Sequence, residues 1–366
     1  SFFWGGKNWR TLTARDGLAA DAVASIAMDS TGAAWLATIA GISRLDTRSW
    51  WTLATPEQPE FEAATSIYED DLGRLWFASD NMGIMVIAGD TVHHITTETG
   101  GLPENMIRSV LVDRYDSVWI GTARQGIVRT NVADLLAPAV GRAPEWQQFG
   151  SETLGSSVIR ASLTGSDGSL WFGTYNGVHH FKPAWNGQGG SWTHFTIEDG
   201  LADNIVSQNA IIEDPAGNIW VGTSTGINLL NSGTDQWTSQ LPGGPQNVRV
   251  LSIAASTDSN AKYAVWAGTE SGDVYALDNN AGRWVVFDKV GNPIYALLAP
   301  DDGHLWVGTG AGLIKIDVAS MMQRLYTRDQ GLSDNEVHVL AREGADVVWI
   351  GTQTAVLRHQ PDNMPP

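Results

Sequence analysis

A cassette that begins with tryptophan recurs eight times along the chain, and it limits the possible folds more than any other feature. Each copy is a tryptophan, an apolar residue or alanine, a glycine or alanine, and a threonine or serine. The copies begin at Trp35, Trp76, Trp119, Trp171, Trp220, Trp266, Trp306 and Trp349. Neighbouring copies are separated by 40 to 52 residues, about 45 on average, which is the length of a four-stranded propeller blade. The repeat therefore predicts a β-propeller rather than a leucine-rich or helical solenoid.

Each unit can be divided into four short strands. In the unit that starts at Gly101, residues 107–113, 117–122 and 126–130 are rich in β-branched residues and are separated by turn residues. A second aromatic starts the fourth strand in six units, with Val92 and Met322 in its place in the other two; the aromatics are Trp9, Trp50, Trp146, Trp192, Trp237 and Trp284. Large rings at two fixed places fill the wedge between neighbouring sheets, so these tryptophans are predicted to form the core.

The two ends of the chain carry complementary deficits. Residues 9–13 form a fourth strand with no blade before it, and the last unit stops near Gln360 with no fourth strand. We therefore predict a single all-β domain over residues 1–366, an eight-bladed propeller whose N-terminal strand completes the last blade and leaves no exposed edge. Seven blades remain the alternative, because the sixth unit carries an insertion before its cassette.

Charge and composition exclude several partners. The chain has 22 Lys and Arg against 40 Asp and Glu, a net charge of −18, which disfavours nucleic acid and anionic membranes because basic side chains hold both. There is no Cys, and hence no disulfide, thiol nucleophile or thiolate metal site. No apolar run reaches about 18 residues, so no membrane insertion is expected of this chain.

Metal and cofactor motifs are not found either. The acidic turns 29–32, 70–73 and 214–217 lack the alternating carboxylates of a calcium loop and are predicted to be structural. The pairs His93/His94 and His179/His180 lie within predicted strands, where neighbouring side chains point to opposite faces. No nucleotide loop, zinc-protease motif or serine nucleophile motif is present, so we expect no metal and no cofactor.

The repeat also resembles a known family. The pattern G-L-x-x-N-x-V, followed by an acidic turn, W-x-G-T and G-[IL], is carried best by the units that start at Gly17, Gly101, Gly200 and Gly331. This pattern resembles the two-component regulator propeller repeat of bacterial membrane-bound sensors. The resemblance implies an extracytoplasmic, periplasmic or secreted, sensor-type propeller. The membrane span, immunoglobulin-like module and output region of that family are not found, so the sequence corresponds to a sensor part alone or to a stand-alone binding protein.

One repeat position gathers basic and aromatic residues. It follows the first apolar residue of the first strand of each unit and reads Ala24, Thr65, Arg108, Arg160, Ser207, Arg249, Tyr295 and His338. In a propeller this strand lines the channel, and the turns after the cassettes open on the same face. Those turns add Asp80, Asn81, Arg124, Gln125, Tyr175, Asn176, Glu270 and Gln353. The predicted ligand-binding residues are Arg108, Arg160, Arg249, Tyr295, His338, Arg124, Tyr175 and Asn176.

Three functions fit this pattern. The first is non-enzymatic recognition of a small anionic molecule or acidic glycan fragment at the channel mouth, since arginine binds carboxylate bidentately. The second is a uronate lyase that uses Tyr295 or His338 as base. The third is a scaffold that binds protein or a second copy of itself. In the structural alternative, each arginine pairs with a nearby carboxylate such as Glu104 or Asp21.

Overall fold

The computed structural model describes residues 9–30, 32–45, 50–52, 64–89, 91–137, 143–185, 187, 189–232, 234, 236–239, 241–258, 261–299, 303–343, 347–352 and 354–359. These residues form eight four-stranded antiparallel sheets, and helix is limited to a few short segments. The chain is therefore an all-β protein with the eight blades of a β-propeller, and seven blades is wrong. Its blades fall into two compact units, Ser1–Ala64 with Asn292–Pro366, and Thr65–Gly291. Each unit is described by itself, and the single domain over 1–366 stays a prediction.

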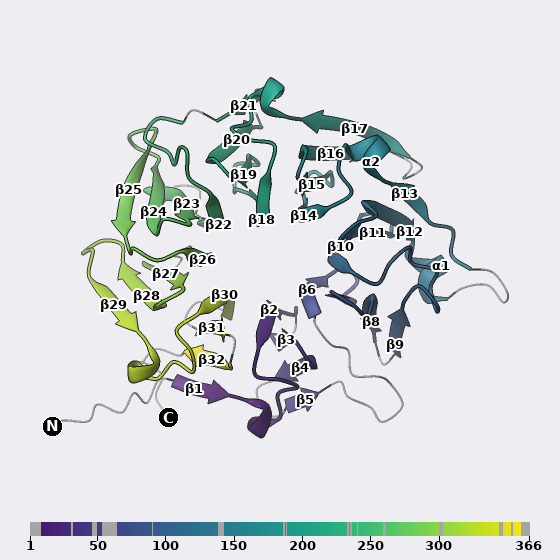
Figure 1. Ribbon diagram of the computed structural model, residues 1–366, viewed down its shortest axis with the longest axis horizontal. Coiled ribbons are helices and arrows are strands. Elements are labelled where there is room, and N and C mark those ends of the chain that lie inside the picture. The colour runs from purple at the N-terminus through teal and green to yellow at the C-terminus, as the bar shows by residue number, and fades with distance from the viewer. Residues whose placement is uncertain are drawn as a thin grey trace. The chain divides into compact units, whose positions relative to one another are not determined.

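The unit Thr65–Gly291 holds blades 2 to 6. In Figure 1 the first strand of each of blades 3 to 6 lies on the inner side of an arc and the fourth strand on the outer side. The strands are β6 (Ala64–Glu69), β7 (Leu75–Ser79), β8 (Ile84–Ala88) and β9 (Thr91–Ile95) in blade 2. Blade 3 has β10 (Ile107–Val112), β11 (Ser117–Thr122), β12 (Ile127–Asn131) and β13 (Gln147–Phe149), with helices α1 (Val132–Leu136) and α2 (Ser151–Leu154). Blade 4 has β14 (Ile159–Thr164), β15 (Leu170–Thr174), β16 (Gly177–Pro183) and β17 (Gly190–Phe195). Blade 5 has β18 (Val206–Glu213), β19 (Ile219–Thr223), β20 (Ile227–Asn231) and β21 (Gln236–Thr238). Blade 6 has β22 (Val250–Ala255), β23 (Tyr263–Thr269), β24 (Asp273–Asp278) and β25 (Arg283–Lys289).

The other unit holds blades 1, 7 and 8, and it contains the predicted closure. Blade 1 has β2 (Val23–Met28), β3 (Ala34–Thr38), β4 (Gly41–Leu45) and β5 (Trp50–Thr52). Blade 7 has β26 (Ile294–Leu298), β27 (His304–Thr309), β28 (Gly312–Asp317) and β29 (Gln323–Tyr326). Blade 8 has β30 (Val337–Glu343), β31 (Val347–Thr352), β32 (Val356–His359) and, as its fourth strand, β1 (Trp9–Leu12). β1 pairs antiparallel with β32 from Trp9↔His359 to Leu12↔Val356, so the N-terminal strand completes the last blade as predicted.

The cassette tryptophans form the core of the blades, as the sequence predicts. All eight are at most 5% exposed. In blades 1, 2, 3 and 5 the indole Nε1 donates to the aspartate that opens the preceding turn; for example, Trp119 donates to Asp113 Oδ2 at 2.8 Å. The same aspartates accept backbone amides within their turns, as Asp113 does from Ser117 at 3.0 Å. These hydrogen bonds confirm the structural role of the acidic turns.

The Gly-Leu pair of the repeat has a local structural reason. Gly17, Gly200 and Gly331 each end a single 3-10 turn, η1 (Ala14–Asp16), η2 (Ile197–Asp199) and η3 (Arg328–Gln330), with φ near +105°. Only glycine adopts this left-handed backbone without strain. The leucine that follows is buried each time, so the pair turns the chain into the next blade and anchors it there. No helix among the described residues is long and apolar enough to cross a membrane.

Candidate functional site

The repeat position predicted to face the channel is a β-bulge. In the seven inner strands with a described register, pairing with the second strand shifts just after the first residue. In β10, for example, Ile107 pairs with Thr122 and Ser109 with Gly121, which leaves Arg108 as the extra residue. A bulge re-aims its side chain, and these lie at the strand end that carries the turns after the cassettes. We call this end the bulge face.

Arg108 on this face is neutralised by a carboxylate. Its Nη1 lies 3.0 Å from Oδ1 of Asp80, which belongs to the turn after the cassette of blade 2. The partners suggested from the sequence were wrong: Glu104 Oε1 accepts the backbone amides of Arg124 and Gln125, and Asp21 accepts the amide of Ala14. Both members of the Arg108–Asp80 pair are about one third exposed, so solvent weakens the attraction between them.

Arg160 is held differently, by neutral groups. Its Nε donates to the carbonyl oxygen of Val206 in blade 5 at 2.5 Å, and its Nη1 donates to the hydroxyl of Tyr175 at 2.7 Å. The guanidinium also lies 4.6 Å from the centre of the Tyr175 ring, which is 48% exposed. No carboxylate among the described residues forms a salt bridge with Arg160. Two of the predicted ligand-binding residues, Arg160 and Tyr175, therefore lie together, and their contact leaves guanidinium donors unused.

Arg249 does not share the register of the other two arginines, and the sequence alignment was wrong here. Val250 pairs with Thr269 and Ser252 with Gly268, so the bulge residue of blade 6 is Leu251. Arg249 lies one residue before β22, where its carbonyl accepts the amide of Glu270 at 3.0 Å. Its Nη1 is 3.7 Å from Oε2 of Glu270, and both side chains are about half exposed.

Arg124 and Asn176, two further predicted residues, lie in separate surroundings on this face. Arg124 is exposed and lines a cavity of about 330 Å³ together with Gln125, Gln148 and Glu152. Asn176 is tied into blade 4, because its carbonyl accepts Nε2 of His194 at 2.5 Å.

Behind this contact lies a buried histidine. His194 stacks on His179, which is 1% exposed. Burial lowers the pKa of His179 to about 3, aided by the nearby His194 charge and opposed by the hydrogen bond to the carbonyl of Leu154. His179 therefore stays neutral at physiological pH.

Tyr295 and His338 belong to the other unit, where they meet each other. Both are bulge residues of neighbouring inner strands, β26 and β30. Their rings stack with centroids 4.7 Å apart, and Nε2 of His338 lies 3.3 Å from Oε2 of Glu336. This pair can offer an aromatic surface and a proton donor or acceptor.

The sequence analysis missed a wide bulge in blade 5. Val206 pairs with Thr223, and the next pair is Ile211 with Val221. Four residues, 207–210, therefore lie opposite a single residue of β19, whereas in the other blades with a described register two residues lie opposite one. The insertion exposes Gln208 and Asn209 on the bulge face, and Asn209 has a left-handed backbone with φ +55°. Ser207 is 2% exposed, and its Oγ has no hydrogen-bond partner among the described residues. The signal was the two extra residues between Val206 and Asp214 relative to the unit at Gly101.

Metal-binding groups do not gather in the described part of the chain. No three His, Asp or Glu side chains among these residues are arranged to hold an ion. Gln353, one of the predicted turn residues, and the side chain of Thr65 lie outside the described residues.

The segments that match a known repeat include residues of the bulge face. The sequence model of the two component regulator propeller matches residues 101–124 and 200–225. In these two segments the chain carries the two component regulator propeller repeat. The first segment includes Arg108 and Arg124, and the second includes the wide bulge of blade 5. No curated protein sequence matches the chain.

Solved structures share the fold at low sequence identity. The extracellular domain of a putative one component system from B. thetaiotaomicron is 18% identical with a TM-score of 0.55; the match covers 97% of this chain and 52% of that one. Virginiamycin B lyase from Staphylococcus aureus is 12% identical with a TM-score of 0.57, covering 96% and 98%. Sqt1 from Saccharomyces cerevisiae is 12% identical with a TM-score of 0.68, covering 97% and 99%. These likenesses concern the fold alone, and the chain spans about half the length of the B. thetaiotaomicron domain.

Proposed function

We propose that the chain is a sensor-type recognition propeller that acts outside the cytoplasm of a bacterium and binds a small anionic molecule or acidic glycan fragment on its bulge face. The repeat that it carries and the fold that it shares with an extracellular sensor domain support the sensor role. Both the ligand class and the location outside the cytoplasm belong to the proposal.

The contact between Arg160 and Tyr175 carries the proposal. A guanidinium has five N–H donors, and Arg160 uses one on Val206 and one on Tyr175. Those two contacts fix the orientation of the guanidinium before a ligand arrives, and the remaining donors match the two oxygens of a carboxylate. The exposed ring of Tyr175 adds a surface on which a sugar ring can pack.

Isothermal titration calorimetry with glucuronate, galacturonate and their short oligomers tests this function, with glucose and cellobiose as neutral controls. Arg160→Ala is expected to weaken acidic ligands by about 10- to 100-fold, the loss of one charge-assisted contact of about 1.5 to 3 kcal/mol. Arg283→Ala, at an exposed arginine that starts outer strand β25, is the matched control and should bind as the original chain does.

Arg108→Ala tests whether Arg108 binds the ligand or only neutralises the carboxylate of Asp80. Because Arg108 already pairs with Asp80, its loss should cost less than about 1 kcal/mol of stability and change affinity far less than the loss of Arg160. Failure of every acidic ligand to bind, or full affinity in Arg160→Ala, would remove the proposal. Mass spectrometry of ligand incubated with the protein tests the lyase alternative, which requires a cleaved product.

A further inference from the structure

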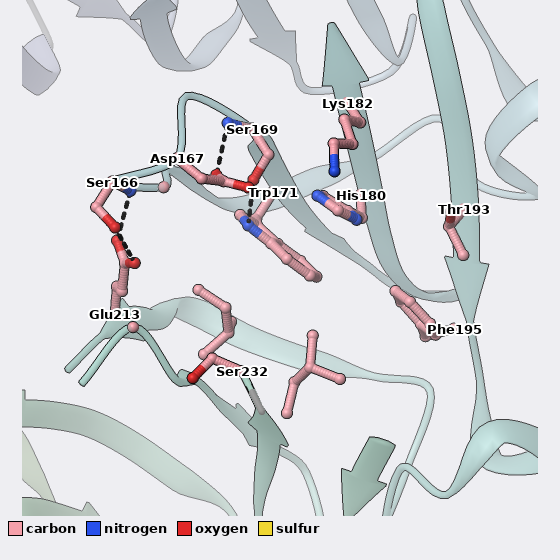
Figure 2. A pocket seen from close by; sticks show the side chains of 14 residues that line it. Ser166, Asp167, Ser169, Trp171, His180, Lys182, Thr193, Phe195, Glu213 and Ser232 are labelled. Atoms are coloured by element: carbon pink, nitrogen blue, oxygen red, sulfur yellow. Dashed lines mark hydrogen bonds between the residues drawn. The ribbon is translucent and has the colours of Figure 1, made fainter. Parts of the chain in front are cut away.

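A cavity of about 620 Å³ lies between blades 4 and 5, away from the bulge face (Figure 2). Its wall includes the turn after β14, the second strand of each blade and the end of β18. β14 runs from Ile159, beside Arg160 on the bulge face, to Thr164, which leads into this turn. The cavity is therefore at the opposite end of that strand, and its volume is within the usual range for small-molecule sites, about 300 to 1,000 Å³.

Comparison with blade 3 shows how the cavity arises. There Asp113 accepts the indole N–H of Trp119, and Arg129 lies 4.8 Å from the centre of the ring and donates to the carbonyl of Gly187. The aspartate and the arginine together fill the space around the tryptophan.

In blade 4 both members of that pair are replaced by smaller residues. Gly165 opens the turn in place of aspartate, and His180 pairs with Trp171 across the strands where Arg129 pairs with Trp119. The indole Nε1 of Trp171 donates to Ser169 Oγ at 3.1 Å instead, and the His180 ring stacks on it at 3.9 Å. The cavity is thus the room that a carboxylate and a guanidinium occupy in blade 3.

Charged groups of both signs line the cavity. Lys182, Asp167 and Glu213 face it, and none of the three forms a salt bridge with another described residue. In Figure 2 the Lys182 side chain lies on the His180 side of Trp171, and Glu213 lies on the other side, beside Ser166. Glu213 accepts the backbone amide and the hydroxyl of Ser166 at 2.7 and 2.5 Å, which fixes its position.

Asp167 remains ionised. Burial acts to raise its pKa, but the hydrogen bonds from Ser169 and the charges of His180 and Lys182 outweigh burial and lower the pKa below its ordinary value. The cavity therefore offers fixed negative charge as well as a lysine. Ile219, Leu230 and Phe195 provide an apolar wall.

We propose that this cavity binds a small zwitterion, an α-amino acid with an apolar side chain. Its carboxylate is held by Lys182, its ammonium group by Glu213 and Asp167, and its side chain by the apolar wall. A ligand with one charge of each sign replaces the carboxylate and the guanidinium that blade 4 lacks. A purely anionic ligand would be repelled by the two carboxylates, and a purely cationic ligand would be repelled by Lys182. This inference does not depend on the function proposed for the bulge face.

Calorimetry of the full chain with L-leucine and L-phenylalanine tests the proposal, next to their N-acetyl and C-terminal amide derivatives. The free amino acids are expected to bind and both blocked forms to bind at least tenfold more weakly. Lys182→Met and Glu213→Gln should each weaken binding at least tenfold, while Lys289→Met, at an exposed lysine of blade 6, should not. Equal binding of blocked and free forms, or no binding of either amino acid at millimolar concentration, overturns the proposal.

A second variant rebuilds the blade 3 arrangement. Gly165→Asp with His180→Arg should fill the cavity, abolish amino-acid binding and keep or raise the unfolding temperature. An added Cβ at Gly165 would meet the ends of the Asp167 and Ser169 side chains at 3.0 and 3.1 Å, which can move, and Nε1 of Trp171 at 3.4 Å, the limit of ordinary contact. Retained amino-acid affinity in this folded variant also overturns the proposal. Should the variant not fold, the Lys182→Met comparison decides.

Discussion

The imidazole rings of His179 and His194 stack face to face, with centroids 4.2 Å apart and planes inclined by 9°. His179 comes from β16 and His194 from β17, where the two residues are paired across the strands. Only the His179 ring is buried, and burial, aided by the nearby His194 charge, lowers the pKa of His179 to about 3. His179 therefore stays neutral in the folded chain well below pH 6.5.

This contact predicts a loss of stability in mild acid. The pKa of His179 is about 3 in the folded chain and about 6.5 when unfolded, so below pH 6.5 the unfolded state binds more protons. Stability should fall as pH drops from 6.5 towards 3, by about 1.4 kcal/mol per pH unit within that window. Urea unfolding at pH 7.5, 5.5 and 4.5 measures it. His179→Phe keeps a stacked ring without a titrating group and should show a flatter profile; parallel profiles would contradict the expectation.

The fold could be predicted from the sequence because the tryptophan cassette recurs in every blade and the other features of the repeat recur in several blades. Two tryptophan positions, an acidic turn and a Gly-Leu pair each have a reason within one unit, and eight copies make the period unmistakable. The pairing of the N-terminal strand with the last blade could be predicted because the first unit has one strand too many and the last unit one too few.

The site could be predicted only where it kept the repeat's register. Arg160 keeps the bulge register that the repeat predicts, and the structure places it beside Tyr175. The predicted position of Arg249 was wrong because Val248, the apolar residue before it, resembles in the sequence the first residue of the strand. That strand begins at Val250. The Asp80 partner of Arg108 comes from another blade, and the cavity of blade 4 comes from residues that depart from the repeat.

Loss of the closing strand is expected to destabilise the unit that holds blade 8. Leu12 at the end of β1 is fully buried, and β1 pairs along its whole length with β32, so deleting residues 1–14 unpairs that edge. The single change Leu12→Ala should already cost about 2 to 5 kcal/mol, and the deletion more. Thermal and urea unfolding measure both, with Thr11→Ala as the neighbouring control. Equal unfolding temperatures for the truncated and full chains would show that β1 is dispensable.

The cassette tryptophans should matter for stability and not for binding. Trp220 is 1% exposed and its indole N–H donates to Asp214 Oδ2 at 2.8 Å, so Trp220→Ala leaves a cavity and removes one hydrogen bond to that carboxylate. We expect a loss of about 3 to 5 kcal/mol. Trp185→Ala removes a side chain that is 89% exposed and should change stability by less than about 0.5 kcal/mol. Ligand affinity of the folded fraction should stay unchanged; lost binding with retained stability would mean that the ring faces a ligand.

The wide bulge of blade 5 should tune ligand selectivity rather than stability. Asn209 has φ +55°, a region that asparagine and glycine tolerate and β-branched residues do not. Asn209→Gly should therefore change stability by less than about 0.5 kcal/mol, whereas Asn209→Val should cost about 1 to 2 kcal/mol.

The position of the wide bulge of blade 5, next to Arg160, is the reason to expect an effect on ligand selectivity. Arg160, the arginine proposed to bind the anion, donates to the carbonyl of Val206 immediately before the insertion. The exposed side-chain amides of Gln208 and Asn209 follow it in the chain. Gln208→Ala combined with Asn209→Gly should change the ranking of different uronic acids in calorimetry while all of them still depend on Arg160. An unchanged ranking would show that the insertion is only structural, and a loss of all acidic ligands equal to that in Arg160→Ala would show that it positions the arginine itself.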